Sequence, residues 1–226
     1  MSDAELDRIR AAYHERDAAA ESPYRWDNPG YVSYMQDLER SLVRALADAG
    51  IDLRRTRVLD VGCGTGYFLH RLQEYGATDC HGIDLMQERI DEARRRYPTL
   101  ELRTGSATEL PYERGEFGLV TQFTCLSSIV DDRVRAQAAA EMRRVAAGGW
   151  LLSFDMRSGS REAATPTVGL DPTELRRLLG EPEILRRVTL SFPLAQRLGR
   201  HHLLASTLRA APFLRSHYLG LWRETD

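Results

Sequence analysis

Glycines recur at every second position from Gly62 to Gly66, directly after the apolar run 58–61. Glycine adopts backbone conformations that other residues resist, and its lack of a side chain lets a ligand approach the main chain. A helix that begins behind such a loop offers free N–H groups to polar ligand atoms. Asp84 follows the loop by about 20 residues, where an acidic side chain can bind ribose hydroxyls. The pattern therefore predicts a site for a nucleotide-type ligand.

The spacing of the glycines separates two classes of cofactor. Dinucleotide-binding folds prefer G-x-G-x-x-G, which packs the helix close and accommodates a pyrophosphate. Here the third glycine, Gly66, comes one residue early, and Tyr67 occupies the dinucleotide position. The spacing therefore disfavours nicotinamide and flavin cofactors. A glycine-rich turn without a ligand is the alternative, and the placement of Asp84 argues against it.

The elements around this loop alternate between strand and helix. Short apolar runs predict strands at 58–61, 80–83, 100–103, 117–123 and 150–154, with helices between them, and this alternation indicates an α/β fold with a parallel sheet covered on both faces. The first fifty residues read as helical, and Asn28 and Pro29 mark a helix start. In the tail we expect helices at 171–179 and 194–208 and strands at 184–192 and 217–222.

Composition limits the class of protein. The chain has 226 residues, of which 42% are hydrophobic and 28% charged, and this suits one domain with some appended elements. A net charge of −2 and no run of apolar residues that could span a bilayer disfavour nucleic-acid and membrane partners. The three cysteines stand far apart and suggest neither a disulfide framework nor a metal site. The polar, acidic N-terminus is unlike a signal peptide, so we expect a cytoplasmic protein.

Four segments resemble, in order, the successive motifs of class I S-adenosylmethionine-dependent methyltransferases. They are VLDVGCGTG at 58–66, HGIDL at 81–85, GSATELPYERGEFGLV at 105–120 and EMRRVAAGGWLLSFD at 141–155. The flanking segments, which contain Asn28-Pro-Gly followed by Gln36 and Glu39-Arg40, and the tail at 214–219, resemble a bacterial subgroup often linked to natural-product or polysaccharide clusters. The resemblance implies a Rossmann-like methyltransferase fold with a seven-stranded, mostly parallel sheet. It also implies an N-terminal helical cap at 1–50 over the cofactor site, and a domain at 51–226 with a helical insert at 193–212 before the last strand.

The same resemblance implies a role for individual residues toward S-adenosylmethionine. The glycine loop with Asp60 would surround the methionine part, Asp84 would bind the ribose, and the segments after the next strands would meet the adenine and the methyl group. The implied cofactor-binding residues are Tyr13, Asp60, Gly62, Gly64, Gly66, Asp84, Leu85, Met86, Ser106, Ala107, Gln122, Phe123 and Thr124.

Ser106 departs from the family pattern, in which an aspartate usually accepts the adenine amino group. A serine hydroxyl can accept the same hydrogen bond, but more weakly than a carboxylate. Two other departures, Gly118 and Ala147, fall at structural positions and leave the cofactor assignment unchanged.

The methyl acceptor is expected to be a small molecule, such as a natural product or a sugar, methylated by SN2 transfer on O, N or C. Positioning carries much of the rate, and a hydroxyl acceptor would also need a general base. The candidates for catalysis are His14, Asp155 and His201, and those for acceptor contacts are Tyr24, Trp26, Arg157 and His202. One of His201 and His202 should face inward, toward substrate or toward core. Methylation of RNA or protein, and a non-methylating, cyclase-type reaction, stay open as alternatives, as does the choice between monomer and homodimer.

Overall fold

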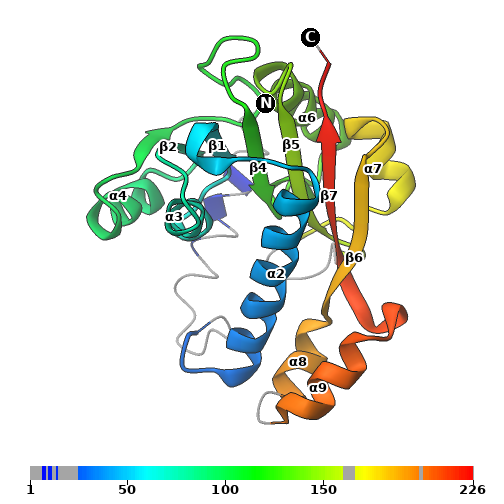
Figure 1. Cartoon of the computed structure of the whole chain (residues 1–226). Helices are drawn as coiled ribbons and strands as arrows, with labels where there is room; N and C mark the ends of the chain where they lie inside the picture. Colours follow the sequence, from blue (N-terminus) through cyan, green and yellow to red (C-terminus); the bar gives the residue numbers. More distant parts are fainter. Residues whose placement is uncertain are drawn as a thin grey trace.

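A seven-stranded sheet organises the molecule (Figure 1). The computed structural model describes residues 7, 8, 10, 11, 14, 25–159, 166–198 and 201–225, without the side chains of 202, 203 and 206. The strands are β1 (Arg57–Val61), β2 (Asp79–Asp84), β3 (Glu101–Thr104), β4 (Leu119–Phe123), β5 (Trp150–Met156), β6 (Ile184–Leu190) and β7 (Arg215–Arg223). Their order across the sheet is β3-β2-β1-β4-β5-β7-β6, and only β7 runs antiparallel to its neighbours. The predicted α/β class and the seven-stranded, mostly parallel sheet are confirmed.

The order of the strands creates a crevice between β1 and β4. From β1 the chain proceeds outward to β2 and β3, and then returns to place β4 on the other side of β1. Val58 accordingly lies between Cys80 of β2 and Leu119 of β4. In open sheets of this kind, ligands bind beyond the carboxyl ends of the strands at the point where the order reverses.

The helices of the described segments cover both faces of the sheet. They are α2 (Pro29–Asp48), α3 (Tyr67–Glu74), α4 (Gln87–Arg96), α5 (Cys125–Ser128), α6 (Asp132–Val145), α7 (Pro172–Leu179), α8 (Phe192–Leu198) and α9 (His202–Arg209), with 3-10 turns η1 (Leu53–Arg55) and η2 (Pro212–Leu214). Helices α2, α3 and α4 pack against one core cluster, and α5, α6 and α7 pack against another. Both clusters include residues of β1, β4, β5 and β7, but they use alternate residues of each strand. On β4, for example, Leu119 faces one cluster and Val120 the other, as the two-residue period of a strand requires.

Local signals explain where α2 begins and how it is held. The Asn28 side chain accepts hydrogen bonds from the N–H groups of Gly30 and Tyr31, and Pro29 occupies the first turn, as predicted. Leu38 and Leu42 are fully enclosed against the sheet. This helix therefore covers one face of the sheet directly. Of the cap predicted at 1–50, most of residues 1–24 lies outside the described residues.

The prediction of one continuous helix at 194–208 is wrong. The structure has two helices, α8 and α9, and His201 is the N-cap residue of the second. The apolar stripe continues across the break, since Ala195, Leu198 and Ala205 share one small core cluster. The stripe therefore indicated a single helix, although Gly199, a poor helix former, stands between the two parts.

Among the helices that the structure describes, none is both long and apolar enough to cross a membrane.

Candidate functional site

The glycine loop joins β1 to α3 and depends on left-handed backbone conformations. Gly62, Gly64 and Gly66 have φ angles of 74°, 54° and 80°. The N–H groups of Gly62 and Cys63 both donate to the carbonyl oxygen of Ile83, at 2.8 and 3.1 Å, which ties the loop to β2. A Cβ atom on Gly62 would lie 2.8 Å from Cys125 Sγ, so the loop also packs directly on α5. Glycine is thus required here by conformation and by the close approach of another segment.

Asp84 fixes the loop through both carboxylate oxygens. Its Oδ2 accepts the N–H of Gly64 at 2.8 Å, and its Oδ1 accepts the N–H of Met86 at 2.9 Å. The side chain also lines the cavity beside the loop. Because an ionised carboxylate offers about four lone-pair sites, these two bonds leave acceptor capacity for ligand hydroxyls.

The cavity lies at the carboxyl ends of β1, β2 and β4 and contains about 650 Å³ of space, part of it open to solvent. Its lining residues are Gly62, Ile83, Asp84, Leu85, Met86, Arg89, Gly105, Ser106, Ala107, Thr108, Phe123, Cys125, Ser128 and Ile129. The structure therefore brings Gly62, Asp84, Leu85, Met86, Ser106, Ala107 and Phe123 together, as the motifs predicted. One carboxylate among mostly apolar walls suits a ligand with a polar ribose and a flat, apolar base.

Asp60 lies beneath the loop and is almost completely buried. Burial raises the pKa of its carboxyl to about 7, the hydrogen bond from Thr121 Oγ1 at 2.8 Å opposes this shift, and the charge of Asp84 adds to it. Asp60 is absent from the cavity wall, so in this conformation it supports the loop from below.

Ser106 reaches the cavity, but its hydroxyl is engaged in the turn that follows β3. Its Oγ accepts the N–H of Thr108 at 3.2 Å and lies 2.8 Å from the hydroxyl of the same residue. This small turn holds the backbone of Ser106 and Ala107 along the cavity wall. The weakened adenine contact expected from a serine is consistent with a hydroxyl that already has two local partners.

Phe123 and Thr124 end β4 in a conformation that turns the chain sharply. Thr124 has a φ of 60°, which is uncommon for a residue other than glycine, and its N–H donates to the carbonyl of Phe154 at 2.7 Å. Phe123 lines the cavity and stacks on Phe68 of α3, with ring centroids 3.9 Å apart. Strained residues of this kind gather at functional sites, and here the strain directs the chain from β4 into α5.

Gln122 and Asp155 are both completely buried. The amide nitrogen of Gln122 donates to Asp155 Oδ2 and Ser153 Oγ, and Asp155 Oδ1 accepts the N–H of Ser127 at 3.1 Å. The oxygen of Gln122 accepts the N–H of Cys125 at 2.8 Å. Burial raises the pKa of Asp155 to about 6, against the effect of these hydrogen bonds. The two side chains thus anchor the N-terminus of α5 from inside the sheet. In this conformation neither side chain reaches the cavity, contrary to the prediction that both contact a ligand.

His217 of β7 is buried and has a structural role. Its Nε2 lies 3.2 Å from the hydroxyl of Tyr34 and its Nδ1 lies 2.9 Å from Thr189 Oγ1. The ring also stacks on Phe154, with centroids 4.6 Å apart. Burial lowers its pKa to about 4, so the imidazole is neutral at neutral pH.

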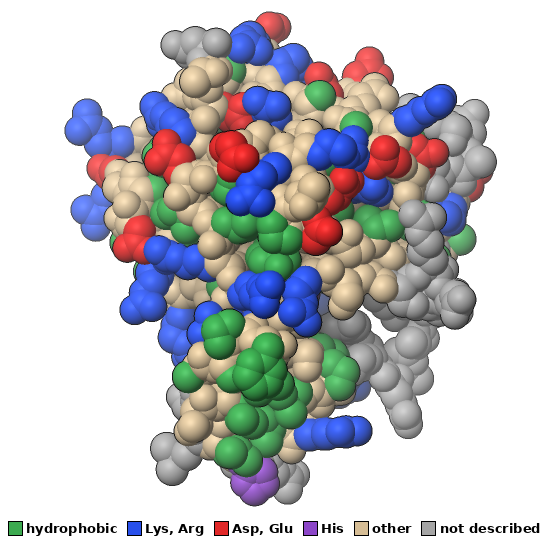
Figure 2. All heavy atoms as spheres, turned by 90° about the vertical axis from the view of Figure 1, so that its right-hand side faces the viewer, with side chains coloured by type: hydrophobic (Ala, Val, Ile, Leu, Met, Phe, Trp, Pro, Cys, Tyr) green, Lys and Arg blue, Asp and Glu red, His purple; other side chains and the backbone are tan. Residues whose placement is uncertain are grey.

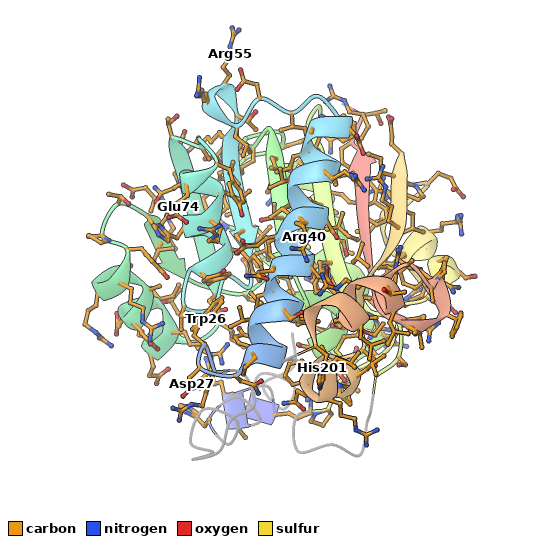
Figure 3. The ribbon with its side chains drawn as sticks, turned by 60° about the horizontal axis from the view of Figure 1, so that its bottom comes forward. Trp26, Asp27, Arg40, Arg55, Glu74 and His201 are labelled. Atoms are coloured by element: carbon orange, nitrogen blue, oxygen red, sulfur yellow. The ribbon has the colours of Figure 1, made fainter. Side chains whose placement is uncertain are left out.

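None of the remaining predicted residues that the structure describes lines the cavity. Trp26 is 52% exposed and contacts the ring of Tyr67, with centroids 5.0 Å apart. Figure 3 shows Trp26 on one side of the N-terminal end of α2, and the exposed His201 beside α8 and α9 on the other. His14 is exposed, and Arg157 follows β5 and is half-buried. Tyr13, Tyr24 and the side chain of His202 lie outside the described residues.

The N-terminal segment approaches the cavity through Arg8, whose Nη2 donates to the carbonyl oxygen of Ser128 at 3.0 Å. Ser128 belongs to α5 and lines the cavity together with Cys125 and Ile129. The motifs did not reveal these three residues, although their spacing places them on one face of a helix directly after β4. The other lining residues that the motifs did not reveal are Ile83, Arg89, Gly105 and Thr108.

Comparison with known proteins agrees with this geometry. A family profile described as "Methyltransferase domain" matches residues 58–149. The ubiquinone biosynthesis O-methyltransferase of Bordetella avium is 31% identical over 178 residues, which are 76% of this chain and 68% of that protein. Relatives matched over shorter stretches are named as N-methyltransferases and a C-methyltransferase. The chain spans about a third of the length of the first two curated relatives, at 34% and 38%.

Solved structures show the same fold at low sequence identity. The PH0226 protein of Pyrococcus horikoshii superposes with a TM-score of 0.66 at 17% identity, over 91% of this chain and 97% of that one. The [4+2]-cyclase SpnF superposes with a TM-score of 0.64 at 18% identity, over 97% of this chain and 94% of that one. From the ordered motifs, the cavity beside Asp84 and the similarity to the Bordetella protein, we conclude that this chain belongs to the class I S-adenosylmethionine-dependent methyltransferase family.

Proposed function

We propose that this protein transfers the methyl group of S-adenosylmethionine to a small-molecule acceptor by in-line SN2 displacement. The observation that carries the proposal is the cavity at the carboxyl ends of β1, β2 and β4, which both Asp84 and Phe123 line. When bound, the cofactor supplies a methyl group that its positive sulfur already activates. The protein is then left mainly with the tasks of holding and orienting the two reactants.

The residues of the cavity fit such a cofactor. Asp84 uses one lone pair of each oxygen on the loop, and the remaining acceptor sites suit the two ribose hydroxyls. Leu85 and Met86 provide an apolar wall for the adenine, and the backbone beside Ala107 borders its edge. Phe123 and the glycine loop mark the end at which the methionine part would lie.

The character of the walls supports a small acceptor. Phe123 lies in the cavity wall, stacks on the ring of Phe68 and is backed by the buried ring of Phe154. Apolar rings of this kind bind flat organic molecules. The near-neutral chain gives no support to a nucleic-acid substrate. The relative from Bordetella, by its name, serves ubiquinone biosynthesis, which also concerns a small molecule.

A cofactor-binding but non-methylating function remains the second candidate, because SpnF, a cyclase, shares the fold. The test is incubation with S-adenosylmethionine labelled on its methyl group and a panel of phenolic, amine and sugar acceptors. We expect label in at least one acceptor and an equal amount of S-adenosylhomocysteine. Tight cofactor binding without transfer to any acceptor class would favour the second candidate.

Replacing Asp84 by asparagine tests the site itself, with Asp79→Asn as a matched control at the opposite, exposed end of the same strand. The NH2 group of the new asparagine would face the N–H of Gly64 or Met86, where two donors cannot bond. The neutral side chain would also bind the ribose more weakly. Loss of charge-assisted hydrogen bonds at about 1.5–3 kcal/mol predicts a roughly 10- to 100-fold weaker cofactor affinity by calorimetry. The cofactor affinity of the Asp79→Asn control should stay within about twofold of that of the natural protein. Unchanged affinity in Asp84→Asn would remove Asp84 from the site.

A further inference from the structure

A second hollow lies outside the candidate cofactor site and shares no lining residue with it. It contains about 980 Å³ of space, part of it open to solvent, between α2, β6, α9 and the start of β7. Its lining residues are Asp37, Ser41, Arg44, Arg186, Arg187, Val188, Thr189, Arg209, Pro212 and Arg215. We propose that this arginine groove binds a ligand through a phosphate or diphosphate group.

Charge distinguishes the groove from the rest of the molecule. Five guanidinium groups line it, against the single carboxylate of Asp37, whereas the chain as a whole carries a net charge of −2. Asp37 is itself shared, since Arg40 approaches its Oδ1 and Arg209 its Oδ2. In Figure 2 the arginine side chains gather in a band just above the lobe formed by α8 and α9, whose surface on this side is hydrophobic. Such a concave cluster of one sign concentrates anions.

Two of the arginines build the frame of the groove. Arg215 donates from Nε to the carbonyl oxygen of Arg209 at 2.8 Å and from Nη1 to that of Arg187 at 2.9 Å. Arg209 pairs with Asp37 and donates from Nη2 to Ser33 Oγ at 3.0 Å. These bonds tie α9, β6 and the start of β7 together around the groove. The hydroxyl of Thr189 is likewise occupied by His217.

The other three arginines retain donors for a ligand. Arg187 is held by a hydrogen bond from Nε to the hydroxyl of Tyr218 at 3.2 Å, with both terminal nitrogens left over. Arg44 is exposed and has no hydrogen bond or ion pair with any other residue in the described part of the chain. Arg186 donates from Nη2 to Asp48 at 2.6 Å, while its Nη1 is buried without a hydrogen-bond partner.

Arg186 Nη1 is enclosed by protein and has no acceptor. A buried charged donor without an acceptor is unfavourable, so a shift of this side chain toward an anion in the groove would be favourable. The flat, five-donor guanidinium matches phosphate oxygens in pairs, and several guanidiniums together suit a multiply charged anion better than a single carboxylate. The volume exceeds that of a diphosphate and leaves room for an attached group.

The test is calorimetric titration with inorganic pyrophosphate at constant ionic strength. The double variant Arg44→Gln/Arg187→Gln removes two of the available guanidiniums, and Arg55→Gln/Arg95→Gln removes the same charge from exposed sites away from the groove. We expect the first to weaken binding at least about tenfold and the second less than about twofold, because only the first loses charge-assisted hydrogen bonds. Equal binding of pyrophosphate by the two double variants would overturn the proposal. So would a natural protein that binds neither pyrophosphate nor vesicles of an anionic phospholipid.

The second probe separates the two sources of a phosphate group. Vesicles with 30% phosphatidylglycerol should bind the natural protein and not the Arg44→Gln/Arg187→Gln variant if the group belongs to a lipid, whereas pyrophosphate binding alone indicates a free phosphorylated molecule. Binding of polyglutamate with neither phosphate probe would overturn the proposal in favour of an acidic peptide. S-adenosylmethionine affinity should be unchanged in both double variants, so failure here is distinct from failure of the proposed function.

Discussion

Replacing Gly62 by alanine should damage the glycine loop more than the same change at Gly64. Both glycines have a positive φ, 74° and 54°, so alanine is strained at either position. At Gly62 the new Cβ would also lie 2.8 Å from Cys125 Sγ and 2.9 Å from Cys125 Cβ. At Gly64 the nearest atom is Arg89 Nη1, at 3.6 Å, which is an ordinary contact. The pair of variants therefore separates steric overlap from backbone strain.

The expected magnitudes follow from these contacts. A left-handed conformation costs an alanine about 1–2 kcal/mol, and this applies to both variants. Forcing an extra methyl group into a packed site costs about 1–3 kcal/mol more, and this applies to Gly62→Ala alone. The free energy of unfolding should thus fall by about 1–2 kcal/mol in Gly64→Ala and by about 2–5 kcal/mol in Gly62→Ala. In a chain of this size, the difference corresponds to roughly 2–12 °C in melting temperature.

Urea denaturation followed by tryptophan fluorescence measures both free energies, with calorimetry as a check on cofactor binding. A double-mutant cycle with Cys125→Gly, which removes both overlapping atoms, should show a favourable coupling with Gly62→Ala and none with Gly64→Ala. If Gly62→Ala unfolds no more easily than Gly64→Ala, the packing of the loop on α5 does not limit this position, and the reasoning from the close approach fails.

Two further predictions concern buried carboxylates. In Asp155→Asn an amide NH2 would face the donors on Gln122 or Ser127. The free energy of unfolding, measured by urea titration, should therefore fall by about 1–3 kcal/mol. An unchanged stability with reduced turnover would instead make Asp155 a catalytic group. Burial raises the pKa of Asp60 from 3.8 to about 7, so between about pH 4 and 7 the folded state holds a proton that the unfolded chain has lost. The free energy of unfolding therefore falls as the pH rises through this window. Asp60→Asn should flatten that slope in thermal melts, and an unaltered pH profile would show that Asp60 is ionised in the fold.

The strands and the loop could be predicted because their signals are local. Apolar runs bounded by glycine or polar residues mark each strand, and the period of the apolar residues separates strand from helix without knowledge of distant contacts. The cap of α2 at Asn28 is a signal of the same kind, since the residues that it binds are two and three positions away. The break between α8 and α9 could not be predicted in this way, because the apolar stripe that the two helices share continues across it.

The directions of individual side chains could not be predicted in this way. Gln122 and Asp155 end neighbouring strands and were expected to reach a ligand, yet both turn inward to bind the amides that begin α5. That orientation depends on donors contributed by another segment and on full burial, neither of which a strand pattern reveals. The cavity-lining face of α5 could not be predicted for a similar reason, since a helix of four residues has almost no periodicity of its own.

The sequence by itself determined the α/β alternation, the glycine loop and the acidic residue that accompanies it, because each rests on residues near one another in the chain. Only the tertiary structure decided what these parts face. It placed Asp84 where one carboxylate holds the loop and borders the cavity, and it withdrew Asp155 into the sheet. It also gathered arginines from α2, β6, α9 and β7 into one groove, because strand order and helix packing bring together residues that lie far apart in the chain.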